Sequence, residues 1–140
     1  MIFSPQQKDE WLKFLLLRTN NSDENFGIID DEFLKGKEMT LNKFRPLMEY
    51  FERLNFIELQ LNNWAGISYY FRQEAIDFLG RGGFVAQEDI FENNIEKLLL
   101  EIDNLKKELA PDKLDTINKL TSIGNSILSG LNIISSIKNF

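Results

Sequence analysis

The chain has 140 residues, of which 43% are hydrophobic and 27% charged, and its formal net charge is −6. It contains no cysteine and no histidine, which excludes disulfides, thiolate or imidazole nucleophiles and zinc sites built from these side chains. The length fits one compact domain, or a small domain with an extension. Carboxylate pairs remain, but no recognisable site gathers them. We therefore expect a cytoplasmic protein that is not an enzyme and holds no metal and no cofactor.

The chain opens with a segment typical of a helix start. Pro5 suits the first helical position, and Ser4 and Gln7 have the spacing of a capping box, in which each side chain bonds the other residue's backbone. The segment turns polar at once and does not resemble a signal peptide. The helix should end near Thr19, because residues 20–25, "NNSDEN", have loop composition.

Two helices are expected next. Residues 26–40, "FGIIDDEFLKGKEMT", leave room for little beyond one short helix at 30–35. Thr40 suits the cap of a longer helix. Pro46 lacks an amide donor, so this helix either kinks there or begins near Arg45. Its apolar stripe consists of Leu41, Phe44, Leu47, Phe51 and Leu54.

From residue 57 the hydrophobic period changes to two. The stretches "IELQL" and "ISYYF" alternate as paired strands do, and "NNWAG" between them predicts the loop of a β-hairpin. Asn62 and Asn63 are expected to form the turn. Trp64 is either an exposed contact residue or folded back onto the core. A short helix then ends at Gly80.

The order of helix, short helix, helix, hairpin and short helix resembles a winged helix-turn-helix domain, the family of many bacterial transcription regulators. The resemblance covers about residues 5–84 and is closest in "RLNFIEL" and "ISYYFRQEAIDFLGRGGF". Asn55 and Ala75 stand where the family often has glycine. The resemblance implies a mainly α chain with a small antiparallel β-hairpin (α+β), whose third helix reads the major groove of DNA and whose hairpin is the wing.

The resemblance places one basic cluster at the DNA-facing side. The candidate DNA-binding residues are Lys35, Lys37, Asn42, Lys43 and Arg45. Arginine and asparagine suit base edges, and lysine suits phosphates. Two other interpretations stay open for the cluster: an ordinary solvated surface, which the nearby acids 30–32 favour, and a protein-binding surface. The loop Asn62-Asn63-Trp64, the candidate wing tip, carries no base, and the whole chain is acidic, which is unusual for a DNA-binding protein.

Residues 85–140 predict a second module, a helical extension to the winged-helix domain 1–84. A helix at 88–109 has a coiled-coil-type seam, and after Pro111 a second amphipathic helix is expected at 112–138. The second helix favours a buried hairpin or oligomer helix over contact with a membrane surface. The seam, a candidate dimerisation surface, consists of Phe91, Ile95, Leu98, Ile102, Leu105 and Leu109.

Three hypotheses follow from these features. The first is a homodimeric transcriptional regulator that binds DNA through the winged-helix domain and pairs through the C-terminal helices. The second is a non-catalytic adaptor or assembly module that uses the same fold to bind a protein partner. The third is peripheral attachment to a membrane through the C-terminal helix.

Overall fold

The computed structural model describes residues 2–19, 23–108 and 111–136, with the side chains of 134–136 left undescribed. The chain forms two compact units. The N-terminal unit comprises Lys8–Gly83, and the C-terminal unit comprises Ile2–Gln7 together with the chain from Phe84 onward.

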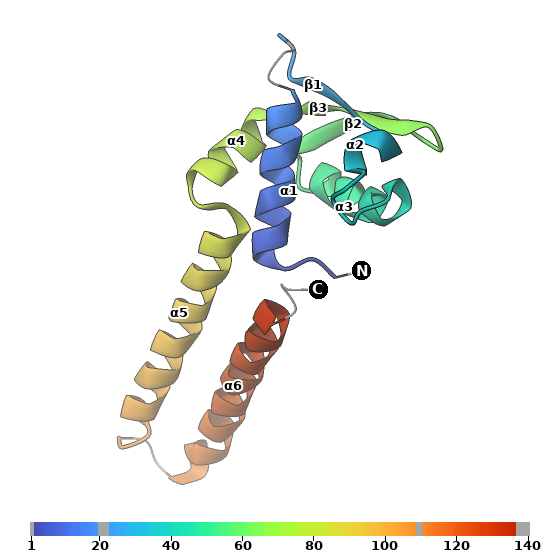
Figure 1. Cartoon of the computed structure of the whole chain (residues 1–140). Coiled ribbons are helices and arrows are strands. Elements are labelled where there is room, and N and C mark those ends of the chain that lie inside the picture. The colour runs from blue at the N-terminus through green and yellow to red at the C-terminus, as the bar shows by residue number, and fades with distance from the viewer. Residues whose placement is uncertain (1, 20–22, 109–110, 137–140) are drawn as a thin grey trace. The chain divides into compact units, whose positions relative to one another are not determined.

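The N-terminal unit joins helices to one small sheet (Figure 1). Its elements are α1 (Pro5–Arg18, whose first turn belongs to the C-terminal unit), β1 (Phe26–Ile29), α2 (Asp31–Leu34), α3 (Leu41–Arg53), β2 (Ile57–Asn63), β3 (Gly66–Phe71) and α4 (Gln73–Gly80). The strands form an antiparallel sheet in the order β1-β3-β2. The predicted α+β class, mainly helical with a small antiparallel sheet, is confirmed.

Strand β1 was not predicted. Its four residues, FGII, pair with β3 in the register Ile28↔Ser68, about forty residues along the chain. Gly27 lies opposite Tyr69, and a Cβ there would lie 2.5 Å from the tyrosine oxygen. A four-residue segment carries too little period to predict a strand, and this one is stabilised by its partner strand.

Two predicted helix starts are confirmed. Ser4 N donates to Gln7 Oε1 at 2.9 Å and Gln7 N donates to Ser4 Oγ at 3.2 Å, which is a complete capping box. Thr40 caps α3 by accepting a hydrogen bond from Lys43 N at 3.3 Å. Helix α3 therefore begins at Leu41 and not near Arg45, and it continues past Pro46. Pro46 is solvent-exposed, so water can satisfy the carbonyl that it leaves without a donor.

Asn55 ends α3 in the conformation that glycine favours. Its φ is +62°, its N–H donates to Glu52 O at 2.9 Å, and Phe56 N donates to Phe51 O at 3.0 Å. These two bonds define a Schellman motif, which places one left-handed residue after the helix. Asparagine tolerates this conformation better than most residues with a side chain.

The core of the N-terminal unit lies between the helices and the sheet. Phe44 and Phe51 of α3 are fully buried, as are Leu12 and Leu15 of α1. Tyr69 of β3 is also fully buried, and its hydroxyl donates to Leu15 O at 2.7 Å, which satisfies one of the unpaired carbonyls at the end of α1. The strand β3 therefore fixes the end of α1 through a side chain.

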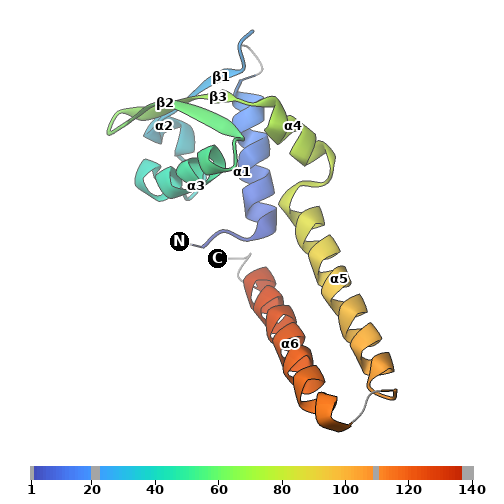
Figure 2. The same ribbon diagram turned by 180° about the vertical axis from the view of Figure 1, so that it is seen from behind.

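The C-terminal unit contains two long helices of 23 residues each, α5 (Gly83–Leu105) and α6 (Leu114–Ser136), joined through a 3-10 turn at Pro111–Lys113. They run antiparallel and lie side by side in both views (Figures 1 and 2). Both helices were predicted, although α5 begins five residues before the expected start. Between them, a Cβ on Gly124 would lie 2.6 Å from Leu99 Cδ2.

Candidate interaction surfaces

Arg45 on α3 forms hydrogen bonds to the β-hairpin made of β2 and β3. Its guanidinium donates one hydrogen bond to Asn62 Oδ1 and another to the carbonyl of Asn63. The side chain is half-buried, and its donors face the hairpin tip, residues Asn62–Ala65. Its hydrogen bonds therefore connect α3 to the hairpin tip.

The hairpin tip is held in shape by its own side chains and presents an indole to solvent. Asn63 Oδ1 accepts hydrogen bonds from Ala65 N at 2.9 Å and Gly66 N at 3.2 Å, so Asn63 is a turn former as predicted. Trp64 is 89% exposed, the largest value among the large hydrophobic residues that the structure describes. Of the two interpretations of Trp64, the structure shows the exposed one.

The predicted basic cluster is divided in space. Asn42 and Arg45 line one open hollow together with Trp64 and Asp31, whose carboxylate accepts a hydrogen bond from Leu41 N at 3.0 Å. Lys37 lies elsewhere: its ammonium is 4.9 Å from the ring centroid of Phe14 on α1.

All three lysines of the cluster are exposed. Lys43 lies in the first turn of α3, next to Asn42, and Lys35 follows α2. Neither lysine lines the hollow beside Trp64. The structure thus brings Asn42, Arg45 and the hairpin tip together, while Lys35 and Lys37 lie outside that group.

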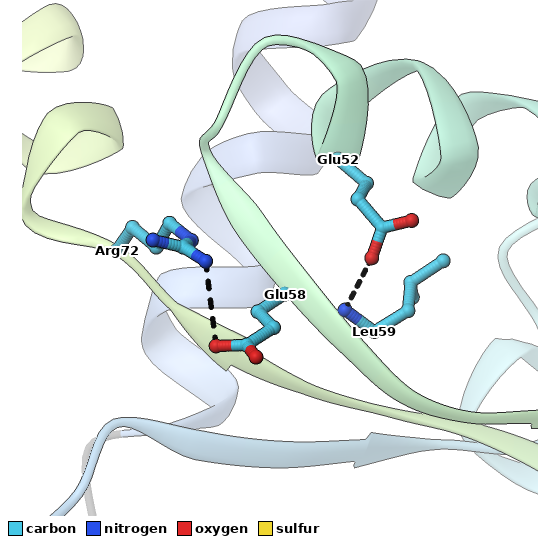
Figure 3. A network of polar contacts seen from close by, with 4 residues as sticks. All are labelled: Glu52, Glu58, Leu59 and Arg72. Atoms are coloured by element: carbon cyan, nitrogen blue, oxygen red, sulfur yellow. Dashed lines mark hydrogen bonds and ion pairs between the residues drawn. The ribbon is translucent and has the colours of Figure 1, made fainter.

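An acidic groove runs between α3 and β2. It is lined by Glu49, Glu52 and Arg53 on the helix and by residues 59–62 on the strand. Glu52 Oε2 accepts a hydrogen bond from Leu59 N at 2.8 Å, which occupies an outward amide of this edge strand (Figure 3). Glu49 and Glu52 lie three residues apart, an ordinary spacing on a helix surface, and no local pattern indicates a bond to a strand.

On the strand itself, Glu58 forms an exposed ion pair with Arg72 at 3.4 Å (Figure 3). Between Asp31 and Glu58 the chain has five bases and six acids. The surface formed by α2, α3 and the hairpin therefore carries almost no net charge, and its basic groups do not gather into one patch.

The predicted seam on α5 is only partly turned toward α6. Ile95 and Ile102 are half-buried, whereas Phe91, Leu98 and Leu105 are 46%, 53% and 51% exposed. Leu109 lies outside the described residues. Leu99, which was not predicted to belong to the seam, approaches Gly124 of α6.

Among the described residues, no group of three or more aspartates or glutamates is arranged to hold a metal ion. Burial raises the pKa of Tyr69, against a smaller opposing effect of the Arg18 charge, and its hydroxyl has a structural partner. No helix among the described residues is long and apolar enough to cross a membrane.

Comparison with known proteins adds no relative. No family model, no curated protein and no solved structure matches the chain. Function is therefore argued from the geometry of these surfaces.

Proposed function

We propose that the chain is a non-catalytic adaptor or assembly protein whose N-terminal unit is a winged-helix module that binds a protein partner through its hairpin tip. The observation that carries the proposal is the exposure of Trp64, 89%, on a turn that Arg45 and Asn63 fix in place. Tryptophan is enriched at the energetic centres of protein interfaces, because it buries a large apolar area and loses few rotatable bonds. A turn that is already ordered also lowers the entropic cost of binding.

The charges beside the tip favour a protein partner over nucleic acid. DNA binding depends on cations that face phosphates. Here Arg45 is bonded to the hairpin, and Glu49 and Glu52 line the groove next to it. The partner that fits this surface offers an apolar pocket for the indole and basic or neutral groups opposite the groove.

The hollow next to Trp64 supplies a polar border for such an interface. Asp31 and Asn42 lie there at the start of α2 and in the first turn of α3. Interfaces of this kind have an apolar anchor surrounded by groups that form hydrogen bonds with the partner. We further propose that the protein acts in the cytoplasm, where a chain without cysteine is unaffected by the reducing environment.

Site-specific photo-crosslinking in an extract of the source cells tests the proposal. Benzoylphenylalanine is placed at position 64 and, as a control, at position 17, since Leu17 is also exposed, at 66%, but lies on α1. We expect one protein adduct of discrete mass at position 64 and none at position 17. An excess of the unmodified chain should abolish the adduct, and an excess of the Trp64→Ala chain should not. An adduct that the Trp64→Ala chain also abolishes would contradict the proposal.

A second candidate function, DNA binding in transcription regulation, is favoured by one observation. Asn42 and Lys43 are exposed in the first turn of α3, the helix that reads the major groove in the winged-helix family. This candidate requires a mobility shift with duplex DNA at low salt that weakens when Lys43 is changed to alanine. The exposed Lys13 of α1, changed to alanine, is the matched control. An equal effect of both changes would indicate general attraction to phosphates only.

A further inference from the structure

Beyond Gly83 and Phe84 at the start of α5, the two long helices bury almost none of their described residues. Among residues 85–108 and 111–133, Gly124 is the only buried one. Large apolar side chains on both helices stay about half exposed, including Leu98 at 53% and Ile123 at 57%. Large apolar side chains that stay exposed next to one another are typical of an interaction surface.

Five of the eight large apolar side chains that are exposed among the described residues of these helices lie on one side of the helix pair, and Ile90, Leu100 and Ile133 point elsewhere. Successive helix residues are rotated by about 100°, so Leu98 and Leu100 point to opposite sides of Leu99, the residue next to Gly124. Because α6 runs in the opposite direction, Ile123, one residue before Gly124, lies on the same side of the pair as Leu98. Residues three or seven positions away on the same helix point to the same side of the pair. This apolar face consists of Phe91, Leu98 and Leu105 on α5 and Leu120 and Ile123 on α6.

We propose that the apolar face binds the same face of a second copy of this chain, so that two helix pairs form a four-helix bundle. The proposal rests on the C-terminal unit alone and is independent of the proposed partner of the hairpin tip. Two helices of 23 residues present a face about 34 Å long and about 20 Å wide. Pairing two such faces buries about 1,400 Å², within the range of stable protein interfaces.

Charges at the border of the apolar face select the orientation of the second copy. Glu101 and Glu108 border the face on α5, each three residues after an exposed leucine, and Lys119 borders it on α6. With Leu99 level with Gly124, Lys119 lies level with residue 104, between the two glutamates. A two-fold axis parallel to the helices places α5 of each copy on α6 of the other. Lys119 then faces Glu101 and Glu108 of the second copy.

The same charges disfavour two other ways of covering the apolar face. The reverse two-fold arrangement, α5 on α5, would bring together two helices that each carry seven acids and three bases over residues 83–108. A membrane surface with anionic lipids would be repelled by this acidic helix, since interfacial helices are usually rich in lysine and arginine. A second copy satisfies both the apolar face and the charged border.

The mass of the full chain in solution, measured by sedimentation, tests the pairing. We expect a dimer of two 16.4 kDa chains. Leu98→Glu should raise the dissociation constant by at least about 100-fold, because it places a charge in the apolar centre. Leu100→Glu, at a leucine that is 63% exposed on the opposite side, should leave the dimer intact. Circular dichroism checks that both variants stay helical.

A monomeric wild-type chain, or equal effects of the two substitutions, would overturn the pairing. So would a wild-type chain that stays monomeric and co-sediments with anionic vesicles.

The orientation has its own test, because the chain contains no cysteine. Glu101→Cys and Lys119→Cys are made as separate variants, and each is oxidised alone and in an equal mixture. We expect a disulfide-linked dimer in the mixture and little in either variant alone. A dimer that forms readily in Glu101→Cys alone would overturn the proposed orientation, because it requires α5 to lie on α5.

Discussion

Single residues decide where several elements of this chain begin and end. Ser4, Gln7 and Thr40 act through neighbours three residues away, so their roles could be predicted from sequence alone. Asn55 and Tyr69 act through conformation and through a distant partner, and each gives a direct test of how the fold is stabilised.

Asn55 should prefer replacement by glycine. Its φ of +62° is strained for side chains and unstrained for glycine. We expect Asn55→Gly to raise the free energy of unfolding by about 0.5 kcal/mol and Asn55→Ala to lower it by about 1 kcal/mol. Chemical denaturation measures both. Glu49→Gly inside α3 is the control and should lose about 1 kcal/mol. Equal losses at both glycine substitutions would contradict the role of the Schellman motif.

Tyr69→Phe should destabilise the N-terminal unit by about 1–3 kcal/mol, because Leu15 O loses its buried donor. The difference should depend on pH. Burial raises the pKa of Tyr69 above its ordinary value of 10.0, so the unfolded chain ionises first and the stabilisation by Tyr69 falls as pH rises above that value. We expect the gap between wild type and Tyr69→Phe to shrink by about 1.4 kcal/mol per pH unit there. A gap that widens with pH would contradict the burial of the neutral hydroxyl.

At the scale of elements, the hairpin and the helix pair depend on contacts that no local rule describes. Arg45 is a residue type suited to contact bases in the major groove of DNA. Its bonds to Asn62 and Asn63 appear only when β2 folds against α3. The run Leu98–Leu100 offers three leucines to a helical seam. Sequence spacing favoured Leu98, whereas the structure turns Leu99 toward Gly124.

Arg45→Met should loosen the hairpin tip without unfolding the unit. It keeps the apolar stem of the side chain and removes both donors to the tip. We expect amide hydrogen exchange at Ala65 and Gly66 to accelerate by about tenfold. Lys43→Met, at an exposed neighbour on α3, is the control and should leave these rates unchanged. Unchanged rates in Arg45→Met would show that the tip does not depend on Arg45.

Two glycines inside α6 form a matched pair. Among the described residues, and apart from its chain neighbours and its own helix backbone, no atom lies within 4 Å of a Cβ built on Gly130, whereas one on Gly124 meets Leu99. Gly130→Ala should therefore stabilise the helix by about 0.5–1 kcal/mol, through helix propensity alone. Gly124→Ala should gain less or lose stability, because Leu99 must move. Thermal unfolding measures both, and equal gains would show that α5 and α6 do not approach each other at this point.

At the scale of the whole molecule, the α+β class and both long helices could be predicted from periodicity and caps. Strand β1 could not, because its four residues become a strand by pairing with β3. The exposure of Trp64 could not be predicted either, since the same turn sequence permits an indole that folds back. Periodic patterns therefore predicted the elements, and tertiary contacts decided which side chains remain accessible.

Trp64 is proposed to bind a protein partner, and the affinity of the purified partner identified by crosslinking measures its contribution. Isothermal titration of that partner into wild type, Trp64→Ala and the control Leu17→Ala gives three dissociation constants. We expect at least a 30-fold weakening for Trp64→Ala, equivalent to about 2 kcal/mol, and no change for Leu17→Ala. A Trp64→Ala chain that binds within about threefold of wild type would contradict the proposal.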